Sequence, residues 1–260
     1  MLAEEISDLR KRMVDEQIAA RGIADAAVLA AMREVPRDAF VPPAYRSDAY
    51  EDSPLPIGAG QTISQPYIVA LMLEAARLRP SDRVLEVGSG SGYATAVASR
   101  IAARVYAIER VADLCERARA QLESLGYLDK IELRCGDGSI GWPEAAPFDA
   151  IILSAGAPAL PVALRRQLVD GGRLVLPIGD DPHEQDLVRV TRRTGSRFEQ
   201  ETLCAVRFVP LIGAEAWPGI AAGGRESALP EPESEAPESD AGDSGANPEA
   251  DPRRPRSPTG

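Results

Sequence analysis

Short apolar runs alternate along the middle of the chain with longer stretches in which apolar residues recur at helical spacing. The runs that we expect to form buried strands cover residues 83–87, 104–108, 131–135, 149–154 and 173–177. Helices are predicted between them at residues 92–102, 112–125 and 160–168. Because strands joined through helices run parallel, this alternation predicts an α/β fold with a mostly parallel, doubly wound sheet that helices cover on both faces.

The two ends of this core follow other patterns. Helices at 4–20, 25–34 and 65–78 are predicted before the first strand, and the last of them shows a 3.6-residue apolar period. Residues 36–63 form a proline-bearing stretch that we expect to be irregular. After the last parallel strand, β-like runs at 186–193 and 203–212 predict a closing antiparallel pair.

Composition changes sharply near the C-terminal end. Residues 214–260 contain ten acids, four arginines and eight prolines, and such a segment has too little apolar surface to offset the entropy of ordering it. We expect most of it to be disordered, with Trp217 docking its start on the body; an acidic interaction tail is the alternative. The folded domain is then 1–213, with N-terminal helices and an active-site segment in 1–80 and a cofactor-binding core in 81–213.

Charge and hydropathy exclude several kinds of partner. The net charge of −11 offers no broad electrostatic attraction for nucleic acid. No apolar run approaches the roughly 18 residues that a membrane span needs. The N-terminal residues MLAEEISDLRKRM place acids where a secretory signal needs positive charge and an apolar core. We therefore expect a cytoplasmic protein without nucleic-acid or membrane partners, and a monomer.

The cysteines and the histidine suggest no catalytic unit of their own. Cys115, Cys135 and Cys204 are far apart and lack CxxC spacing, which fits a reducing compartment and argues against a disulfide scaffold or a zinc site. We expect Cys135 to be a buried strand residue and no metal to bind. His183, the single histidine, lies among acids and a proline and is expected in a solvated loop. Ser-His-Asp or Cys-His chemistry would depend on that residue alone, so it is not expected.

A glycine-rich loop follows the first predicted strand of the core. Residues 84–93 read VLEVGSGSGY, with glycines at 88, 90 and 92, and the next apolar run ends in Glu109. A strand, a glycine loop, a helix and a strand that ends in a carboxylate form the nucleotide-binding half of a doubly wound sheet. Glu109 can accept hydrogen bonds from two ribose hydroxyls, which predicts a pocket for an adenosine-containing cofactor. The alternatives are a loop that only makes a tight turn and an ordinary strand-end charge.

Three acids favour S-adenosylmethionine over a dinucleotide in this pocket. The GxGxG spacing differs from the GxGxxG of dinucleotide enzymes, although by itself it discriminates weakly. Glu86 lies two residues before the first glycine, where a carboxylate can meet the cationic amino end of an amino-acid-bearing cofactor. Asp137, between two glycines, can accept from an adenine amino group, although Asp is also a favoured turn residue. With Glu109 on the ribose and no cluster of Arg or Lys at the loop, the set suits S-adenosylmethionine.

The segment PIGAGQTISQPY at residues 56–67 resembles the signature of protein-L-isoaspartate (D-aspartate) O-methyltransferases. Other segments agree in family order: VPRDAFVPP before it, then VLEVGSGSGY, GDG, PFDAIILSAGAP, GGRLVLPIG and VRFVPLIG. The resemblance covers about residues 10–213. The glycine motif alone specifies a class I methyltransferase, whereas GQTISQP together with RFVPLIG indicates this family.

The resemblance implies a class I, Rossmann-like fold and a repair activity. Such enzymes move the methyl group of S-adenosylmethionine, leaving S-adenosylhomocysteine, to the free α-carboxylate of an L-isoaspartyl, and in some cases D-aspartyl, residue of a damaged protein. A neighbouring backbone nitrogen then attacks the ester carbonyl and expels methanol, and the resulting succinimide hydrolyses partly to aspartate. The substrate carboxylate is already ionised at neutral pH, so orientation and exclusion of water supply most of the catalysis.

Carried over by position, the resemblance implies that Ser64 and Thr62 hydrogen-bond the substrate carboxylate. Ser64 is also a candidate N-cap for the helix that follows, and both roles can coexist. Val209, Pro210 and Leu211 match the segment that holds an extended substrate backbone, although apolar packing is the plainer interpretation. The expected cofactor-binding residues are Gln61, Ile63, Glu86, Gly88, Ser89, Gly90, Gly92, Glu109, Arg110, Asp137 and Gly138.

Two features depart from the family pattern. Asp170 precedes a Gly-Gly pair where methyltransferases more often carry proline, and the acidic tail has no counterpart in the family. One alternative function is a class I methyltransferase for another carboxylate or a small molecule, which would not depend on Ser64. Another is a cofactor-binding or interaction module without catalysis, against which the intact Thr62 and Ser64 argue.

Overall fold

The computed structural model describes residues 3–182, 184–195 and 197–218 of the chain. His183 and residues 219–260, which make up most of the acidic tail, lie outside the described residues, so the expectations about them stay predictions. Across the described part of the chain, no helix combines the length and the apolar character that crossing a membrane requires.

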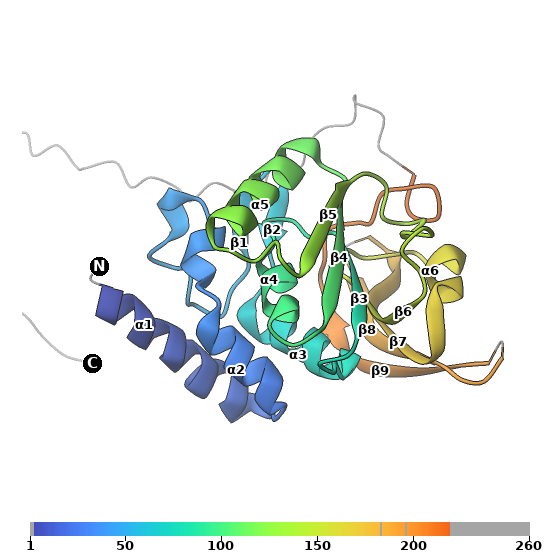
Figure 1. Ribbon diagram of the computed structural model, residues 1–260, viewed down its shortest axis with the longest axis horizontal. Helices are drawn as coiled ribbons and strands as arrows, with labels where there is room; N and C mark the ends of the chain where they lie inside the picture. The colour runs from blue at the N-terminus through green and yellow to red at the C-terminus, as the bar shows by residue number, and fades with distance from the viewer. Residues whose placement is uncertain (1–2, 183, 196, 219–260) are drawn as a thin grey trace, which may run out of the picture. The chain divides into compact units, whose positions relative to one another are not determined.

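A seven-stranded sheet lies at the centre of the described chain (Figure 1). Its strands are β3 (Arg83–Val87), β4 (Arg104–Glu109), β5 (Ile131–Cys135), β6 (Phe148–Leu153), β7 (Leu168–Asp181), β8 (Glu184–Arg192) and β9 (Phe198–Val206). Their order across the sheet is β5-β4-β3-β6-β7-β8-β9. The strands from β5 to β7 pair in parallel, whereas β8 pairs antiparallel with both β7 and β9. The predicted mostly parallel sheet with a C-terminal antiparallel pair is therefore confirmed.

The central strands are apolar because they are covered on both faces. In β3, the side chains of Val84, Leu85 and Val87 are at most 1% exposed although they point to alternate sides. Glu86 is the polar exception in this strand, and it is also buried. A carboxylate in such a position is costly unless it is compensated or used by a ligand.

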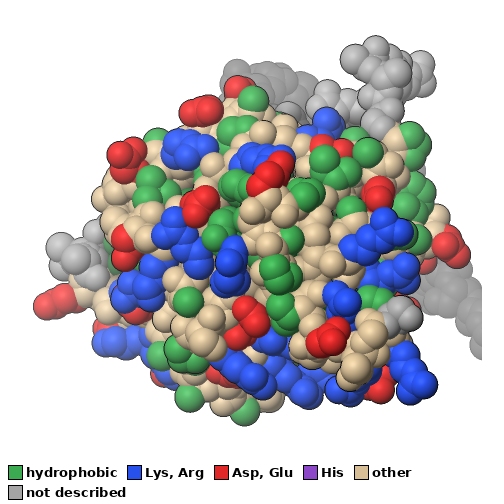
Figure 2. Space-filling model, turned by 45° about the vertical axis from the view of Figure 1, so that its right-hand side comes forward, with side chains coloured by type: hydrophobic (Ala, Val, Ile, Leu, Met, Phe, Trp, Pro, Cys, Tyr) green, Lys and Arg blue, Asp and Glu red, His purple; other side chains and the backbone are tan. Residues whose placement is uncertain are grey.

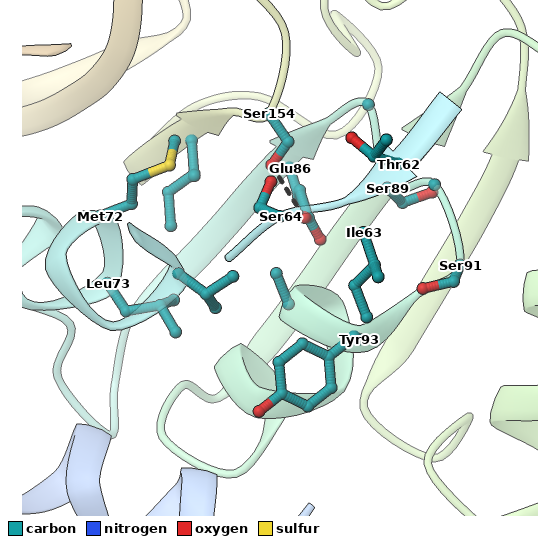
Figure 3. Close-up of a pocket in the computed structure, with 15 residues that line it drawn as sticks. Thr62, Ile63, Ser64, Met72, Leu73, Glu86, Ser89, Ser91, Tyr93 and Ser154 are labelled. Carbon is teal, nitrogen blue, oxygen red and sulfur yellow. Dashed lines mark hydrogen bonds between the residues drawn. The ribbon is translucent and has the colours of Figure 1, made fainter. Parts of the chain in front are cut away.

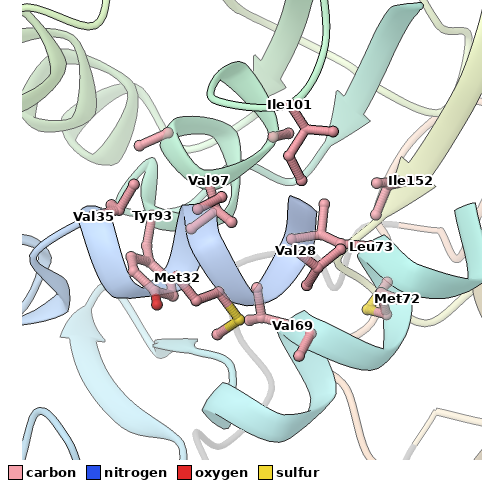
Figure 4. Close-up of a cluster of buried hydrophobic side chains, with 14 of the residues drawn as sticks. Val28, Met32, Val35, Val69, Met72, Leu73, Tyr93, Val97, Ile101 and Ile152 are labelled. Carbon is pink, nitrogen blue, oxygen red and sulfur yellow. The ribbon is translucent and has the colours of Figure 1, made fainter. Parts of the chain in front are cut away.

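Helices and loops supply that cover. Helices α3 (Pro66–Ala76), α4 (Tyr93–Ser99) and α5 (Ala112–Ser124) pack on one face, and α2 (Ala26–Glu34) packs on α3 and α4. Figure 4 shows the apolar side chains that α2, α3 and α4 direct toward one another. The short helix α6 (Val162–Arg166) packs against β7 on the opposite face.

The N-terminal helices are confirmed with altered ends. The first begins as α1 (Ala3–Arg12), widens to π-type turns over Met13–Ile18 and closes in a 3-10 turn at Ala19–Arg21. The Asp25 carboxylate accepts hydrogen bonds from the first backbone N–H groups of α2, which fixes where that helix begins.

A β-hairpin occupies part of the stretch that we expected to be irregular. Strands β1 (Leu55–Gly58) and β2 (Gln61–Ile63) pair antiparallel. The alternation of buried and exposed residues in β1 is a strand pattern, but Pro54 before the strand and Pro56 within it obscure that pattern in the sequence. This hairpin matters because it carries Thr62 and ends next to Ser64.

The last strand also differs from its prediction. The apolar run 203–212 was expected to form it, whereas β9 covers Phe198–Val206. The strand lies at the edge of the sheet and most of its side chains are exposed, so apolarity does not mark it. Residues 207–212 instead lie outside the named strands, and Pro210 forms an isolated bridge with Gly156.

Cys115 and Cys135 form a disulfide, so the expectation that the cysteines would not pair is wrong. Packing of α5 against β5 brings their Cα atoms to 5.7 Å although 20 residues separate them in sequence. Cys135 is also exposed rather than buried, because it is the last residue of β5 at the edge of the sheet. Cys204 is the remaining free thiol.

The described chain continues beyond the predicted domain end at residue 213. Trp217 donates its backbone N–H to the Leu211 carbonyl at 3.0 Å, and Ala214 donates to the Asp137 carboxylate at 2.8 Å. Trp217 therefore ties the start of the tail to the body, as expected.

Figure 2 shows one face of the molecule, on which basic (Lys and Arg) and acidic side chains are interspersed.

Candidate active site

The site lies where the strand order of the sheet reverses. Between β3 and β6 the chain turns in opposite directions, and the loops after these strands leave an open crevice at the carboxyl edge, which is the usual ligand site of such sheets. Two adjoining cavities occupy this crevice. One is lined by the hairpin segment 62–64, the glycine loop and Glu86, and the other by Gln61, Glu109 and residues 209–212.

All three glycines of the loop adopt left-handed backbone conformations, with φ of 84°, 55° and 89° at Gly88, Gly90 and Gly92. A Cβ atom on Gly90 would also lie 3.2 Å from Ile57 of the hairpin, and one on Gly92 the same distance from Leu122 of α5. The glycines therefore let the loop turn and let the hairpin approach it closely. Contact of this loop with a ligand stays a prediction.

Glu109 holds the glycine loop from the end of β4. Its buried carboxylate accepts from the Gly90 N–H at 2.8 Å and from the Val111 N–H at 2.9 Å. Each oxygen keeps a second acceptor position, so the contact with ribose hydroxyls stays a prediction consistent with this geometry. Glu109 and its neighbour Arg110 both line the second cavity, together with Gln61.

Glu86 is a buried carboxylate that faces the first cavity (Figure 3). The hydroxyl of Thr95 donates to one of its oxygens and that of Ser154 to the other, the latter at 3.3 Å. Burial raises the pKa of Glu86 to about 7; the two hydrogen bonds lower it, and the charge of Glu109 raises it. A cation that enters the cavity would stabilise the ionised form of this buried carboxylate.

Serine hydroxyls provide the remaining polar groups of the first cavity. Ser89 and Ser91 have buried hydroxyl oxygens without a hydrogen-bond partner among the described residues. Buried polar groups are almost always paired, so these two await a partner from a ligand or from water. Ser89 was predicted as a cofactor contact, and both serines line the cavity beside Glu86.

Ser64 lies between the first cavity and an outer pocket. Its neighbour Gln65 holds the N-cap position of α3, so Ser64 does not cap this helix. The backbone carbonyl of Ser64 instead accepts a hydrogen bond from the buried guanidinium of Arg37 at 2.8 Å. The outer pocket extends from Thr62 and Ser64 to residues 205–209 at the end of β9, so Ser64 adjoins a groove open to solvent.

Residues 209–211 form the wall of the second cavity. The Val209 carbonyl accepts from the Gly156 N–H at 2.8 Å, and the Leu211 N–H donates to the Gly156 carbonyl at 2.7 Å. Pro210 has no N–H, so the groups left for a substrate backbone are the Val209 N–H and the Pro210 carbonyl. Substrate binding by this segment stays a prediction.

Asp137 is the one predicted acid that does not line either cavity. One of its oxygens accepts from the backbone and hydroxyl of Ser139, and the other accepts from the Ala214 N–H. Its neighbour Gly138 does line the second cavity. An adenine contact by Asp137 therefore stays a prediction, and the position of Asp137 outside both cavities does not by itself support it.

Several polar residues of the site were not predicted from the sequence, and Ser91 in the first cavity and Thr95 beside Glu86 are among them. Ser154 binds Glu86, Arg37 binds the Ser64 carbonyl, and Asp52 accepts from the Tyr67 N–H at the start of α3. Ser154 could have been found, because it follows directly after a predicted parallel strand at the ligand edge of the sheet. Arg37 and Asp52 carry no such signal.

Among the described residues, no three His, Cys, Asp or Glu side chains are grouped to hold a metal ion.

Gly138 gives a direct test of the second cavity. An added Cβ would lie 2.5 Å from a methyl group of the buried Val87 side chain, so Gly138→Ala must displace the end of β3. We expect a loss of stability of about 2 kcal/mol and a Kd for an adenosine cofactor raised about tenfold. Gly126→Ala is the matched control, because its φ of 74° makes the change destabilising as well, while Gly126 lines neither cavity. Calorimetric cofactor titration of both variants would contradict the prediction if they bound equally well.

The glycine loop follows β3 where the strand order reverses, and Glu109 ends the neighbouring parallel strand β4. These features define a Rossmann-like enzyme, here with the class I methyltransferase fold. Residues 8–216 match the family model described as protein-L-isoaspartate(D-aspartate) O-methyltransferase. The chain belongs to this family, and the resemblance noted in the sequence is confirmed.

Individual relatives agree with this assignment. The chain is 60% identical over 208 residues to protein-L-isoaspartate O-methyltransferase 2 of Pelobacter propionicus, an alignment that covers 80% of this chain and 92% of the relative. A solved protein-L-isoaspartate O-methyltransferase superposes with a TM-score of 0.72 at 30% identity, covering 80% of this chain and 67% of the other. A putative enzyme of this kind from Plasmodium falciparum, in complex with S-adenosyl-L-homocysteine, superposes with a TM-score of 0.68 at 28% identity over 78% of this chain and 98% of the other.

Proposed function

We propose that this protein is a repair enzyme that methylates the free α-carboxylate of L-isoaspartyl residues in damaged proteins, with S-adenosylmethionine as the methyl donor. The observation that carries this proposal is the position of Ser64. The hairpin places it on the wall shared by the glycine-loop cavity and the groove that opens to solvent. Ser64, together with Thr62 and Ser154, thus adjoins both the cofactor pocket and a path for a polypeptide.

The pocket suits S-adenosylmethionine by the kind of groups that it offers. Glu86 supplies a buried carboxylate for the ammonium group of the cofactor, and the unpartnered hydroxyls of Ser89 and Ser91 supply further contacts. Glu109 supplies acceptors for the ribose. The remaining contacts are assigned to Gln61, Ile63, Gly88, Gly90, Gly92, Arg110, Asp137 and Gly138.

The chemistry needs orientation more than acid–base groups. When bound, S-adenosylmethionine supplies an electrophilic methyl group on a sulfonium. The substrate carboxylate is ionised at neutral pH, so no side chain has to remove a proton before attack. We assign to Ser64 and Thr62 the hydrogen bonds that orient the carboxylate, so that one of its oxygens faces the methyl group.

Exclusion of water favours the same step. Two opposite charges neutralise as the new bond forms, and both are stabilised less in an apolar cavity than in water. Ile63, Val69, Met72 and Leu73 supply apolar walls on the hairpin and α3 side of the first cavity. The enzyme thus combines apolar walls with a few polar groups that fix orientation.

The outer groove suits an extended chain that carries the damaged residue. It runs from Ser64 past Pro54 and Ile68 to residues 205–209 and is lined by both polar and apolar residues. We assign substrate contacts here and at Val209, Pro210 and Leu211. The partners are therefore isoaspartyl proteins and peptides, and we further propose a cytoplasmic monomer that needs no metal, nucleic acid or membrane.

Methyl transfer to three peptides tests this function directly. The peptides are identical except for L-isoaspartate, L-aspartate or D-aspartate at one position, and labelled S-adenosylmethionine is the donor. We expect labelling of the isoaspartyl peptide and background labelling of the L-aspartyl peptide; the D-aspartyl peptide defines the second activity in the family name. Equal labelling of all three would indicate a general carboxyl methyltransferase, and cofactor binding without labelling would refute catalysis.

A further inference from the structure

Arg37 is a fully buried arginine whose guanidinium lies behind the active-site segment. It donates to the carbonyl of Ala49 at 2.7 Å, to that of Ser64 at 2.8 Å and to that of Ser53 at 3.3 Å. Ala49 and Ser53 lie in the stretch that follows the 3-10 turn at Pro43–Tyr45 and precedes β1, and Ser64 lies between β2 and α3. Among the described residues, these three neutral carbonyls are its hydrogen-bond partners, and no carboxylate pairs with it directly.

Burying a cation without a directly paired carboxylate is costly, so the site must be compensated in other ways. Burial lowers the pKa of Arg37 to about 10, and the nearby Tyr93, Asp52 and Tyr50 oppose this shift, so the group stays charged at neutral pH. The guanidinium also lies over the Tyr93 ring, 5.3 Å from its centroid, at cation–π distance. A planar fork with five donors can satisfy three carbonyls at once, which a lysine cannot do.

The two sides of Arg37 connect the cofactor loop to the substrate segment. Tyr93 is the first residue of α4, follows the glycine loop directly and lines the first cavity. Ser64 follows β2 and lines the same cavity from the hairpin side. Arg37 therefore contacts one element that shapes the cofactor pocket and one that presents the active-site serine.

We propose that Arg37 is a positioning residue that fixes Ser64 relative to the cofactor pocket. Its guanidinium binds the Ser64 carbonyl and is itself held by the Tyr93 ring and by the carbonyls of Ala49 and Ser53. This role rests on the proposed function of Ser64. On the other side of Ser64, Asp52 accepts from the Gln65 side chain and from the Tyr67 N–H. Asp52 thus holds the residues after Ser64, while Arg37 holds Ser64 itself.

Arg37→Lys tests the proposal because it keeps the charge and loses the fork. We expect kcat for the isoaspartyl peptide to fall at least about tenfold, while the Kd for S-adenosylmethionine changes by no more than about twofold. In the Ser64→Ala background, Arg37→Lys should have little further effect on kcat, because its action runs through Ser64. Arg37→Gln, which keeps an amide donor without burying a charge, is the second variant if the lysine variant does not fold.

Arg173→Lys is the matched control. Arg173 is also buried and donates to the carbonyls of Ala76 at 2.7 Å and Arg77 at 2.8 Å, besides pairing with Asp82, but it lines neither cavity. This variant should lower the melting temperature as a buried Arg-to-Lys change does and leave kcat unchanged. A loss of kcat in Arg37→Lys that is no larger than in Arg173→Lys would overturn the proposal.

Amide hydrogen exchange separates this proposal from the proposed function, because it needs no substrate. Exchange in residues 61–67 should accelerate at least about tenfold in Arg37→Lys and stay unchanged in Arg173→Lys. Unchanged exchange in this segment would overturn the positioning role even if the enzyme is active. A wild-type protein that fails to methylate the isoaspartyl peptide, with exchange altered as expected, would refute the proposed function and leave the positioning of Ser64 supported.

Discussion

Ser64→Ala is expected to lower kcat/KM for an isoaspartyl peptide about 100-fold, because a hydrogen bond to a charged group and the orientation that it enforces are both lost. The Kd for S-adenosylmethionine should be unchanged, since Glu86, Glu109 and the glycine loop are untouched. Ser64 lines the cavity beside these groups while its carbonyl is held separately by Arg37. Removing the hydroxyl should therefore leave the backbone of the segment in place.

Steady-state methylation with isothermal titration of the cofactor would measure both effects. Ser64→Thr keeps a hydroxyl and should retain more activity than the alanine variant. Ser124→Ala is the distant control, because Ser124 only caps the last turn of α5 through the Gln121 carbonyl. Wild-type turnover of the isoaspartyl peptide by Ser64→Ala would remove Ser64 from the mechanism.

Glu86→Gln should weaken S-adenosylmethionine binding about 100-fold at pH 8, because it removes a buried charge that would pair with the cofactor ammonium. The same change should stabilise the free protein at that pH. The amide keeps the size of the side chain and can still bond with Thr95 and Ser154, so the cavity should keep its shape. Binding and stability are therefore expected to change in opposite directions.

The pH dependence follows from the raised pKa of Glu86. Its pKa in the folded protein is about 7 instead of the ordinary 4.5, so folding favours the neutral acid. Stability is lost as the pH rises from 4.5 through 7, by roughly 3 kcal/mol at most, and Glu86→Gln should abolish this loss. Cofactor binding needs the ionised form, so wild-type affinity should fall below pH 7, while the variant binds weakly at every pH.

Denaturant unfolding and cofactor titration at pH 5.5 and pH 8 would measure these effects. Glu144→Gln is the control, since this exposed side chain pairs with Arg134 at the surface and should change neither quantity. An unchanged cofactor Kd in Glu86→Gln would show that this carboxylate does not meet the ammonium group. If the wild type and Glu86→Gln lose the same stability between pH 5.5 and pH 8, Glu86 does not titrate near neutrality.

Local sequence was sufficient wherever one segment determines its own conformation. The strands β3 and β5 have their predicted limits, because apolar residues recur at strand spacing in both, on both faces in β3 and on one face in the edge strand β5. The glycines at 88, 90 and 92 predicted a loop that only a left-handed backbone can form, and all three have positive φ. Glu86 and Glu109 could be placed in the site because each has a fixed offset from that loop.

Elements that depend on distant partners were harder to predict. The β1–β2 hairpin lies among prolines, and β9 is an exposed edge strand, so neither shows an apolar pattern that identifies it. The disulfide between Cys115 and Cys135 depends on α5 packing against β5, which spacing in the sequence does not reveal. In each case the deciding contact comes from another element.

The sequence by itself determined the class of sheet, the cofactor loop and the family, because these depend on short segments whose residues act on their own backbone or at a fixed offset. The tertiary structure decided how the site is assembled. It placed Ser64 between two cavities, brought Ser154 to Glu86 and put Arg37 behind Ser64 across 27 residues of chain. Every residue has a backbone carbonyl, so the sequence does not show which carbonyl a buried arginine will bind. Only the path of the folded chain decides which carbonyls lie near it.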